Sequence, residues 1–310
     1  MVDLIFGVTH PEHWHSLNMK QNPSHYSFVA RWGAKSVAML QDKVGAGMYF
    51  NPDVVIDGRR IKYGVISMKS LVGDLTNWNN FYVAGRMQKP IRILRGDSRV
   101  KLSNDQNLVN AVRAALLLLP EQFTEHQLYT AIVGLSYLGD FRMIYGENPK
   151  KVENIVNAQV EFLRVLYLPV VEKLVDQFVA IPEGMRYESG VSARDVMLQQ
   201  RVDLKARGNL LFELPKKVRD KALGAYHKQS ALDSAISAVE LSQKAVASGN
   251  IQALVKTAIA DTVRIPALTQ GSCYGRFVNT SGRSFLNDRR NKMLLYSSFI
   301  SFAFQVILTA

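Results

Sequence analysis

The chain begins with an apolar, β-branched run that contains an acidic residue. The run is Val2–Val8, and Asp3 is its acidic member. A carboxylate inside such a strand-like run costs free energy to bury unless a positive group meets it. A metal ion and a basic side chain could each do so, and the sequence leaves the two open. We therefore expect a strand that presents a polar site, with no signal or transit peptide ahead of it.

Histidines are concentrated directly after this run. Four of the six in the chain, His10, His13, His15 and His25, lie within the first 32 residues. Their spacing matches no zinc-binding pattern of known geometry. Surface or hydrogen-bonding histidines are the simpler interpretation, and a zinc site is the alternative.

The composition indicates a folded, basic protein. A chain of 310 residues with 47% hydrophobic residues suits one large domain or two ordinary ones. Its net charge of +12 favours polyanionic partners, which include nucleic acid, anionic lipid and phosphorylated small molecules. A basic balance is also common among mitochondrial matrix proteins. The lone Cys273 excludes an internal disulfide, and P-loop and Rossmann motifs are absent from the sequence.

Local patterns predict a sheet followed by helices. Strands at residues 48–56 and 60–68 flank Asp57-Gly58, a pair that favours a type I′ hairpin turn. A helix-like segment covers residues 24–41, and Thr124 with Gln127 predicts a capping box. We further expect a strand at 91–94, helices at 103–119, 124–138, 148–177 (bent at Pro169) and 230–264 (interrupted at Gly249), and a loop at 183–208. Domain boundaries are expected near residues 100–105 and near 245.

The end of the sequence is apolar. Met293–Ala310 has no charged residue and is just short of the roughly 20 residues of a membrane-spanning helix. A membrane-seated tail, a buried terminal helix and an incorrect gene model remain open.

Basic residues lie close to aromatic ones in the first hundred residues. Lys62 follows the hairpin turn, and Arg86 and Lys89 follow Trp78 and Tyr82. Such groups bind nucleotides by charge and stacking, and a solvated basic face is the alternative.

A glycine turn, GLSYLGDFR, contains Asp140 and Arg142. A helix-ending turn with a local Asp–Arg pair is a sufficient structural explanation for this motif.

Several segments together resemble the mitochondrial translocator assembly and maintenance protein family, the mitochondrial phosphatidate cytidylyltransferases. They are VDLIFGV, HPEHWHSLNMKQNPSHYS, GAGMYFN, IKYGVIS, NWNNFYVAGRMQKP, LPEQF and GLSYLGDFRM. They occur in the family's order over roughly residues 1–170, and a fainter similarity continues to about Gly282.

The resemblance implies an α+β fold. Residues 1–102 would form a nucleotidyltransferase-like mixed-sheet domain, related in plan to DNA polymerase beta. Residues 103–245 would form a helical, winged-helix-like domain. Residues 246–310 would form a C-terminal helical, membrane-associating region.

The resemblance also implies an activity. It is the Mg²⁺-dependent condensation of CTP with phosphatidic acid to CDP-diacylglycerol and pyrophosphate, in cardiolipin biosynthesis. The enzyme would lie on the matrix side of the mitochondrial inner membrane as a peripheral protein on an anionic membrane surface. Nucleic acid is disfavoured as a partner, and the oligomeric state is left open.

Site residues follow from the matching motifs. The resemblance implies that Asp3 holds Mg²⁺ and that Asp3 and Asp140 are catalytic. The residues it implies for substrate binding are Lys62, Tyr63, Arg86, Lys89, Arg142, His25, Tyr26 and Ser27.

The chain departs from the family in two respects. The Gly-Ser-Gly segment that precedes the acidic strand in the family is absent, and Ile5 replaces the second carboxylate of the usual metal pair. Asp53, Asp57 or Asp140 would have to complete the metal site. We therefore expect an N-terminally truncated chain with weak or no activity. A non-catalytic, membrane-associated assembly factor and a nucleic-acid nucleotidyltransferase are the alternatives.

Overall fold

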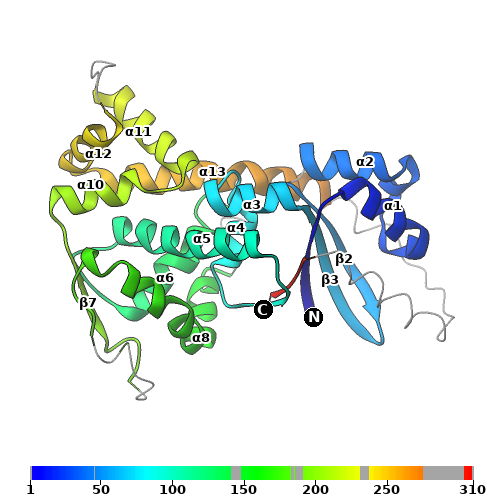
Figure 1. The fold of residues 1–310 in the computed structure, drawn as a ribbon, viewed down its shortest axis with the longest axis horizontal. Helices are drawn as coiled ribbons and strands as arrows, with labels where there is room; N and C mark the ends of the chain where they lie inside the picture. The colour runs from blue at the N-terminus through cyan, green and yellow to red at the C-terminus, as the bar shows by residue number, and fades with distance from the viewer. Residues whose placement is uncertain are drawn as a thin grey trace. The chain divides into compact units, whose positions relative to one another are not determined.

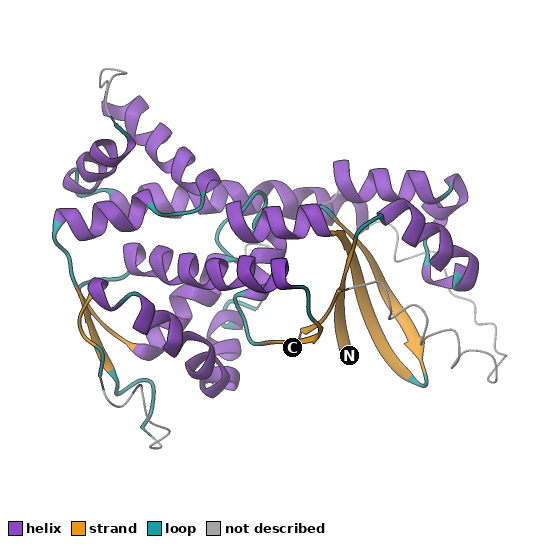
Figure 2. Cartoon of the chain, in the orientation of Figure 1, coloured by secondary structure: helices purple, strands orange, loops and turns teal. Residues whose placement is uncertain are grey.

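The computed structural model shows a mixed α/β protein with two sheets and many helices (Figure 1, Figure 2). Its contacts divide the chain into two compact units. Unit 1 comprises residues 1–72, 91–101 and 266–310, and unit 2 comprises residues 73–90 and 102–265. The domain limits expected from the sequence stay a prediction. The structure describes residues 2–44, 46–140, 148–182, 185, 191–230, 237–274 and 304–308.

Unit 1 contains a five-stranded mixed sheet of order β2-β3-β1-β8-β4, as the sequence predicts for this region. Strand β1 runs parallel to β3, while β2 is antiparallel to β3 and β8 is antiparallel to both β1 and β4. The strands are β1 (Val2–Val8), β2 (Met48–Ile56), β3 (Arg59–Ser67), β4 (Ile91–Arg95) and β8 (Phe304–Leu308).

The hairpin between β2 and β3 is confirmed. Asp57 and Gly58 form its turn with φ values of 48° and 75°. Both positive values are those that a type I′ turn requires, which explains why Asp-Gly occurs here.

Part of the apolar tail is a strand. Residues 304–308 form β8, which lies between β1 and β4, and not the helix that we expected for this region. The sequence FQVIL contains residues that favour strands. As a strand, its backbone forms hydrogen bonds with β1 on one side and β4 on the other, which a helix cannot do. The rest of Met293–Ala310 lies outside the described residues. Within the described part of the chain, no helix is both long and apolar enough to cross a bilayer.

Short helices cover one face of β1 and β3 in unit 1. They are α1 (Pro11–Gln21), the 3₁₀ helices η1 (Pro23–His25) and η2 (Phe28–Trp32), α2 (Ala34–Met39) and the π turn η3 (Leu40–Val44). The single helix expected at 24–41 is therefore wrong, because Gly33 takes a φ of 85° that interrupts it. The core beneath contains Val8, Val54, Tyr63 and Val65.

Unit 2 is mainly helical and has a small antiparallel sheet of order β5-β7-β6. The strands are β5 (Gln122–Thr124), β6 (Phe178–Ala180, after the 3₁₀ helix η4 at Val175–Gln177) and β7 (Met197–Gln200). Its helices include α4 (Tyr82–Met87), α6 (Glu125–Leu135), α8 (Lys151–Lys173), α10 (Leu204–Phe212), α11 (Lys216–Ser230) and α12 (Ala238–Ala247). Three further helices extend across the limits of the units: α3 (Met68–Asn77), α5 (Ser98–Leu118) and α13 (Ile251–Tyr274).

Several local predictions can be compared with these elements. The capping box of α6 is present in full, with Thr124 and Gln127 bonded reciprocally. Helices α12 and α13 are separated at Gly249, as predicted. The bend in α8 lies at Gln159 and not at Pro169, because Gln159 takes non-helical angles of −128° and 16°. The loop expected at 183–208 is wrong where β7 and the start of α10 lie.

A buried ion pair joins two helices of unit 2. Arg164 on α8 donates Nε to Glu125 Oε1 at 2.9 Å and Nη2 to Oε2 at 2.7 Å. The Tyr129 hydroxyl also donates to Oε1, at 2.6 Å. The Glu125 side chain is 0% exposed and that of Arg164 is 6% exposed. The bidentate geometry satisfies a carboxylate that would otherwise be costly to bury.

Candidate functional site

Asp3 lies on β1 directly beside Lys62 on β3. The two residues are register partners in the parallel pair, so their side chains lie on the same face of the sheet. Asp3 Oδ1 is buried and accepts no hydrogen bond from any described residue. The Lys62 ammonium lies 4.6 Å from the centroid of the Phe50 ring. The alternative to a metal ion was a basic side chain that forms an ion pair with Asp3. Among the described residues, no guanidinium forms such a pair.

The opposite face of the same strands contains a hydrogen-bonded cluster of polar aromatic residues. Asn18 Nδ2 lies 2.9 Å from the hydroxyl oxygens of both Tyr26 and Tyr63 and donates to each. His15 Nδ1 lies 2.9 Å from the Tyr26 hydroxyl, and His25 Nδ1 lies 2.8 Å from the Tyr63 hydroxyl. Since each hydroxyl accepts from Asn18, its own hydrogen is directed to a histidine nitrogen.

The cluster holds His15 neutral. Its Nε2 lies 3.0 Å from Gln41 Oε1 and donates to it, so Nδ1 is left as the acceptor for Tyr26. Burial lowers the pKa of His15 to about 4, and the bond to Gln41 opposes this only in part. Burial also raises the pKa of Tyr26. These residues therefore form a neutral hydrogen-bonded network in the core of unit 1.

His15→Gln is expected to remove a source of acid sensitivity. The pKa of His15 is about 4 in the folded protein and 6.5 when exposed, so the unfolded chain binds more protons between these values. Stability therefore falls as the pH falls from 6.5 to about 4, by about 3 kcal/mol for this group. Urea unfolding at the two ends of this window should show a smaller decrease for His15→Gln than for the wild type. His13→Gln, at an exposed position, serves as the control and should keep the wild-type decrease.

The sheet divides the residues predicted for this region into two groups. Successive side chains of β3 point to opposite faces, so Lys62 shares a face with Asp3 and Tyr63 shares the other with the cluster. His25 and Tyr26 belong to the Tyr63 group, and Ser27 Oγ lies 3.3 Å from the Tyr49 hydroxyl. Their role in substrate binding stays a prediction, whereas their mutual bonds show a structural role.

The zinc alternative finds no support in this region. Of the described residues, no three His, Cys, Asp or Glu side chains are grouped as metal ligands. His10 and His13 are exposed, and both nitrogens of His15 have hydrogen-bond partners.

In unit 2, a buried aspartate organises the segment that leads into α4. Asp74 Oδ1 accepts from the backbone N–H groups of Asn80 and Phe81, and Oδ2 accepts from those of Val83 and Ala84, at 2.8–3.0 Å. Burial raises the pKa of Asp74, and the four N–H groups oppose that rise. Phe81 takes a left-handed φ of 59°, which costs about 1 kcal/mol and is held by these bonds.

Asn107 fixes the same segment from α5. Its Oδ1 accepts from Trp78 Nε1 at 2.8 Å and from Gln88 Nε2 at 3.0 Å, while its Nδ2 donates to Ala84 O. The motif NWNNFYVAGRMQKP thus folds around two buried polar side chains, which hold Arg86 on α4 and Lys89 just after it in place.

Arg86 and Lys89 form a cationic cluster together with Lys151. Lys89 Nζ donates to Gly85 O and to Ser136 Oγ, each at 2.9 Å, and lies 5.2 Å from the Tyr137 ring centroid. Burial, and to a smaller extent the positive charges of Arg86 and Lys151, lower the pKa of Lys89 to about 7. A cluster of positive groups creates an electrostatic potential that attracts phosphate.

The glycine turn is brought against α4. A Cβ atom on Gly85 would lie 2.6 Å from Ser136 Cβ, so only glycine allows this approach. Asp140 follows in the same turn, is buried, and donates its backbone N–H to Tyr137 O at 3.3 Å. The structure therefore unites two of the predicted motifs within unit 2. Arg142, predicted to bind substrate, lies outside the described residues.

Sequence reasoning missed the residues that support these groups. They are Asn18 and Gln41 in unit 1, and Asp74, Asn107, Ser136 and Lys151 in unit 2. His15 is a hydrogen-bonding histidine, as the sequence predicted. Asp74 could have been noticed as a carboxylate preceding the turn-rich run NWNN, where backbone N–H groups need acceptors. Asn107 and Lys151 give no such local signal.

Comparison with known proteins gives consistent matches. Residues 1–286 match the family model described as mitochondrial phosphatidate cytidylyltransferase. A protein of that name from Schizosaccharomyces pombe is 52% identical over 171 residues, which are 55% of this chain and 44% of the relative. Those of Mus musculus and Saccharomyces cerevisiae are 49% and 45% identical, over 56% and 59% of this chain and 52% and 49% of the relatives. The chain spans about half the length of the curated relatives it matches.

Proposed function

The chain belongs to the mitochondrial phosphatidate cytidylyltransferase family, and on this premise we propose that it condenses CTP with phosphatidic acid. A phosphate oxygen of phosphatidic acid attacks the α-phosphorus of CTP. The bond from that phosphorus to the oxygen that bridges to the β-phosphate breaks, and CDP-diacylglycerol and pyrophosphate form. Because the nucleophile is already anionic, the protein has to position the two substrates and neutralise their charge.

This proposal depends on the observation that Asp3 Oδ1 is buried and accepts no hydrogen bond from any residue that the structure describes. A carboxylate oxygen is the hard ligand that Mg²⁺ prefers, and Mg²⁺ is commonly held by one or two carboxylates with phosphates and water completing its shell. Asp3 is the one carboxylate that β1 offers, and it fits this requirement. The ion would supply charge neutralisation at the triphosphate.

Two sets of cations would hold the phosphate groups. In unit 1, Lys62 lies in register with Asp3 and would bind triphosphate oxygens on the same face of the sheet. In unit 2, Lys89 and Arg86 would bind the phosphate of phosphatidic acid or the leaving pyrophosphate. Asp140 would orient substrate from the adjoining turn. The resemblance of the GLSYLGDFR motif gives Arg142 a substrate-binding role as well.

We extend the proposal to fold and location. The mixed sheet of unit 1, with its acidic strand beside a basic one, supports a nucleotidyltransferase-like plan. The helices and small sheet of unit 2 support a winged-helix-like plan. The names of the relatives support a mitochondrial location, and the net charge of +12 supports contact with an anionic membrane surface. We place this contact on the matrix side of the inner membrane, as the resemblance implies. The family match does not favour a nucleic-acid enzyme or a non-catalytic assembly factor.

Transfer of the CMP group from labelled CTP to phosphatidic acid tests the function, with Lys89→Met as the informative variant. Losing a charged donor should lower the rate at subsaturating phosphatidic acid about 30-fold. Protonated Lys89 is the binding form and its pKa is about 7, so wild-type affinity should weaken as the pH rises above that value. Lys89→Met should not show this pH dependence.

Lys173→Met, which removes an exposed cation at the end of α8, is the control and should behave as the wild type. A chain that neither binds CTP nor forms product would contradict the proposed function. The same assay, run beside the Schizosaccharomyces pombe relative, tests the expectation of weak activity.

A further inference from the structure

Two aromatic side chains are exposed on η2, a short helical segment of unit 1. Trp32 at the end of η2 is 67% exposed, and Phe28 at its start is 42% exposed. The two rings contact each other edge to face, with their centroids 5.4 Å apart. Aromatic side chains gain much from leaving water, so an exposed pair in contact indicates an interaction surface.

Hydrogen bonds on both sides fix the segment that carries this pair. Ser27, just before η2, lies with its Oγ 3.3 Å from the Tyr49 hydroxyl on β2. After η2, Gly33 takes a φ of 85°, which turns the chain into α2. Ser36 Oγ donates to Trp32 O at 3.0 Å across that turn. The aromatic pair is therefore presented from an ordered part of the chain.

The same region is basic. Residues 13–41 contain no Asp or Glu. They contain three basic residues, all exposed: Lys20, Arg31 and Lys35. Arg31 precedes Trp32 directly, and Lys35 follows it by three residues. Because consecutive Cα atoms are about 3.8 Å apart, the Cα atoms of both lie within about 11 Å of that of Trp32, close to the range of charge interactions at 0.1 M salt.

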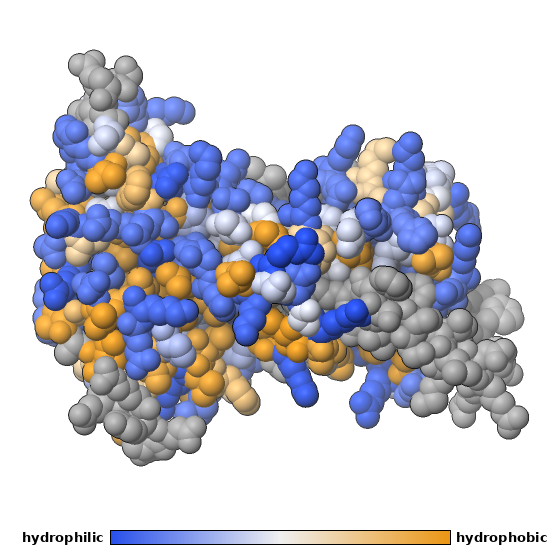
Figure 3. All heavy atoms as spheres, in the orientation of Figure 1, coloured by the Kyte–Doolittle hydropathy of each residue, from blue (hydrophilic) through white to orange (hydrophobic). Residues whose placement is uncertain are grey.

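The two neighbouring helices also combine an exposed apolar side chain with a cation. On α2, Met39 lies one turn after Lys35, and both are exposed. On α1, Lys20 lies one turn after Leu17, and both are exposed. In Figure 3, weakly apolar side chains lie between hydrophilic ones over α2. Apolar and basic side chains mixed in this way on helices are typical of a surface that contacts an anionic membrane.

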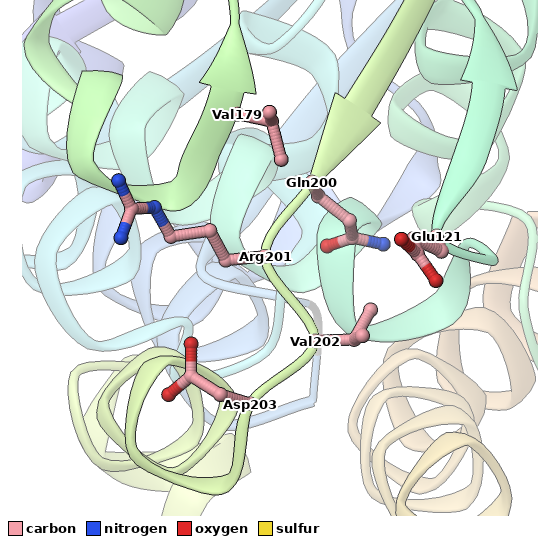
Figure 4. A pocket seen from close by; sticks show the side chains of 6 residues that line it. All are labelled: Glu121, Val179, Gln200, Arg201, Val202 and Asp203. Atoms are coloured by element: carbon pink, nitrogen blue, oxygen red, sulfur yellow. The ribbon is translucent and has the colours of Figure 1, made fainter.

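The hollow of about 360 Å³ beside the small sheet of unit 2 differs in charge (Figure 4). Its lining includes two carboxylates, those of Glu121 and Asp203, and one guanidinium, that of Arg201. An anionic surface would meet more negative than positive charge there. Charge complementarity therefore favours η2 and its neighbours over this hollow.

We propose that η2, with the adjoining exposed residues of α1 and α2, is a docking surface for an anionic lipid bilayer. The rings of Phe28 and Trp32 enter the headgroup layer, and the three cations meet lipid phosphates. The choice of a bilayer rests on the proposed function, because phosphatidic acid is a membrane lipid and is reached at a membrane surface. The inference assigns the membrane contact to a named surface of unit 1.

Flotation of the full chain with vesicles tests this surface. One vesicle contains phosphatidylcholine alone, and the other contains phosphatidylcholine with phosphatidylglycerol, an anionic lipid that is not the proposed substrate. We expect the wild type to prefer the anionic vesicle, and Trp32→Ser to bind it about tenfold more weakly because an indole ring is no longer buried. Arg31→Gln with Lys35→Gln should weaken binding about 25-fold at low salt, since each cation contributes about fivefold. High salt should abolish the second effect and leave the first.

Two matched variants separate this surface from general charge and hydrophobicity. Phe162→Ser removes an aromatic ring that is also 67% exposed, on α8 next to Glu161. Lys216→Gln with Lys217→Gln removes two exposed cations from α11. Both should bind the anionic vesicle as the wild type does. All four proteins should keep the wild-type melting temperature, because every changed side chain is exposed.

Equal binding of the wild type to both vesicles would overturn the proposal. So would an equal loss of binding in Trp32→Ser and Phe162→Ser, or in the two charge variants. A dimer that is lost in Trp32→Ser, measured by sedimentation equilibrium, would assign the surface to a second copy of the chain instead. These vesicles contain no phosphatidic acid, so the results do not depend on turnover. CMP transfer to phosphatidic acid dispersed in detergent should be equal in Trp32→Ser and the wild type, and its absence from both would count against the proposed function alone.

Discussion

Asp3→Asn is expected to lower the rate of CDP-diacylglycerol formation about 1,000-fold and to abolish Mg²⁺-dependent binding of CTP. The amide is a poor ligand for Mg²⁺ and has no charge to offset that of the ion. The same substitution should leave the free energy of unfolding unchanged or slightly higher. Asp3 Oδ1 has no partner among the described residues, and a neutral group costs less to bury.

This combination separates a catalytic role from a structural one. Asp105→Asn makes the same chemical change at an exposed position on α5 and should preserve both activity and stability. Transfer rates, CTP titration calorimetry and urea unfolding provide the three measurements. A marked loss of stability in Asp3→Asn with undiminished turnover would remove Asp3 from the mechanism.

Arg164→Met is expected to lower the free energy of unfolding by about 4 kcal/mol. It leaves the Glu125 carboxylate buried beside the Tyr129 hydroxyl without its bidentate partner. The double variant Glu125→Leu with Arg164→Met should recover most of that loss, because neither charge then remains buried. Denaturant unfolding of the three proteins measures the effect.

Lys216→Met breaks an exposed ion pair with Asp220 and should change stability little, which makes it the matched control. If Arg164→Met unfolded at the wild-type denaturant concentration, the pair would be shown to contribute nothing.

Features set by neighbouring residues could be predicted from the sequence. The Asp57-Gly58 turn depends on two residues that tolerate positive φ, and the capping box depends on Thr124 and Gln127 three positions apart. The break at Gly249 between α12 and α13 has a similar local cause. These elements need no information from distant parts of the chain.

Features that depend on distant contacts could not be predicted. The alternation of a strand already puts Lys62 and Tyr63 on opposite faces, but only the pairing of β3 with β1 shows that Lys62 shares its face with Asp3. Pro169 suggested a bend by its chemistry, whereas α8 departs from helical geometry at Gln159, a residue whose local sequence gives no such signal. The approach of Lys89 to Ser136 joins residues 47 positions apart, and no local pattern indicates it.

The aspartate that gathers four backbone amides ahead of α4 has a thermodynamic consequence for ligand capture. A loop that froze only when its ligand arrived would lose conformational entropy at that moment and weaken the complex. Here the segment is ordered during folding, so an anion that bound there as we propose would meet a preorganised site and its association would incur no such loss.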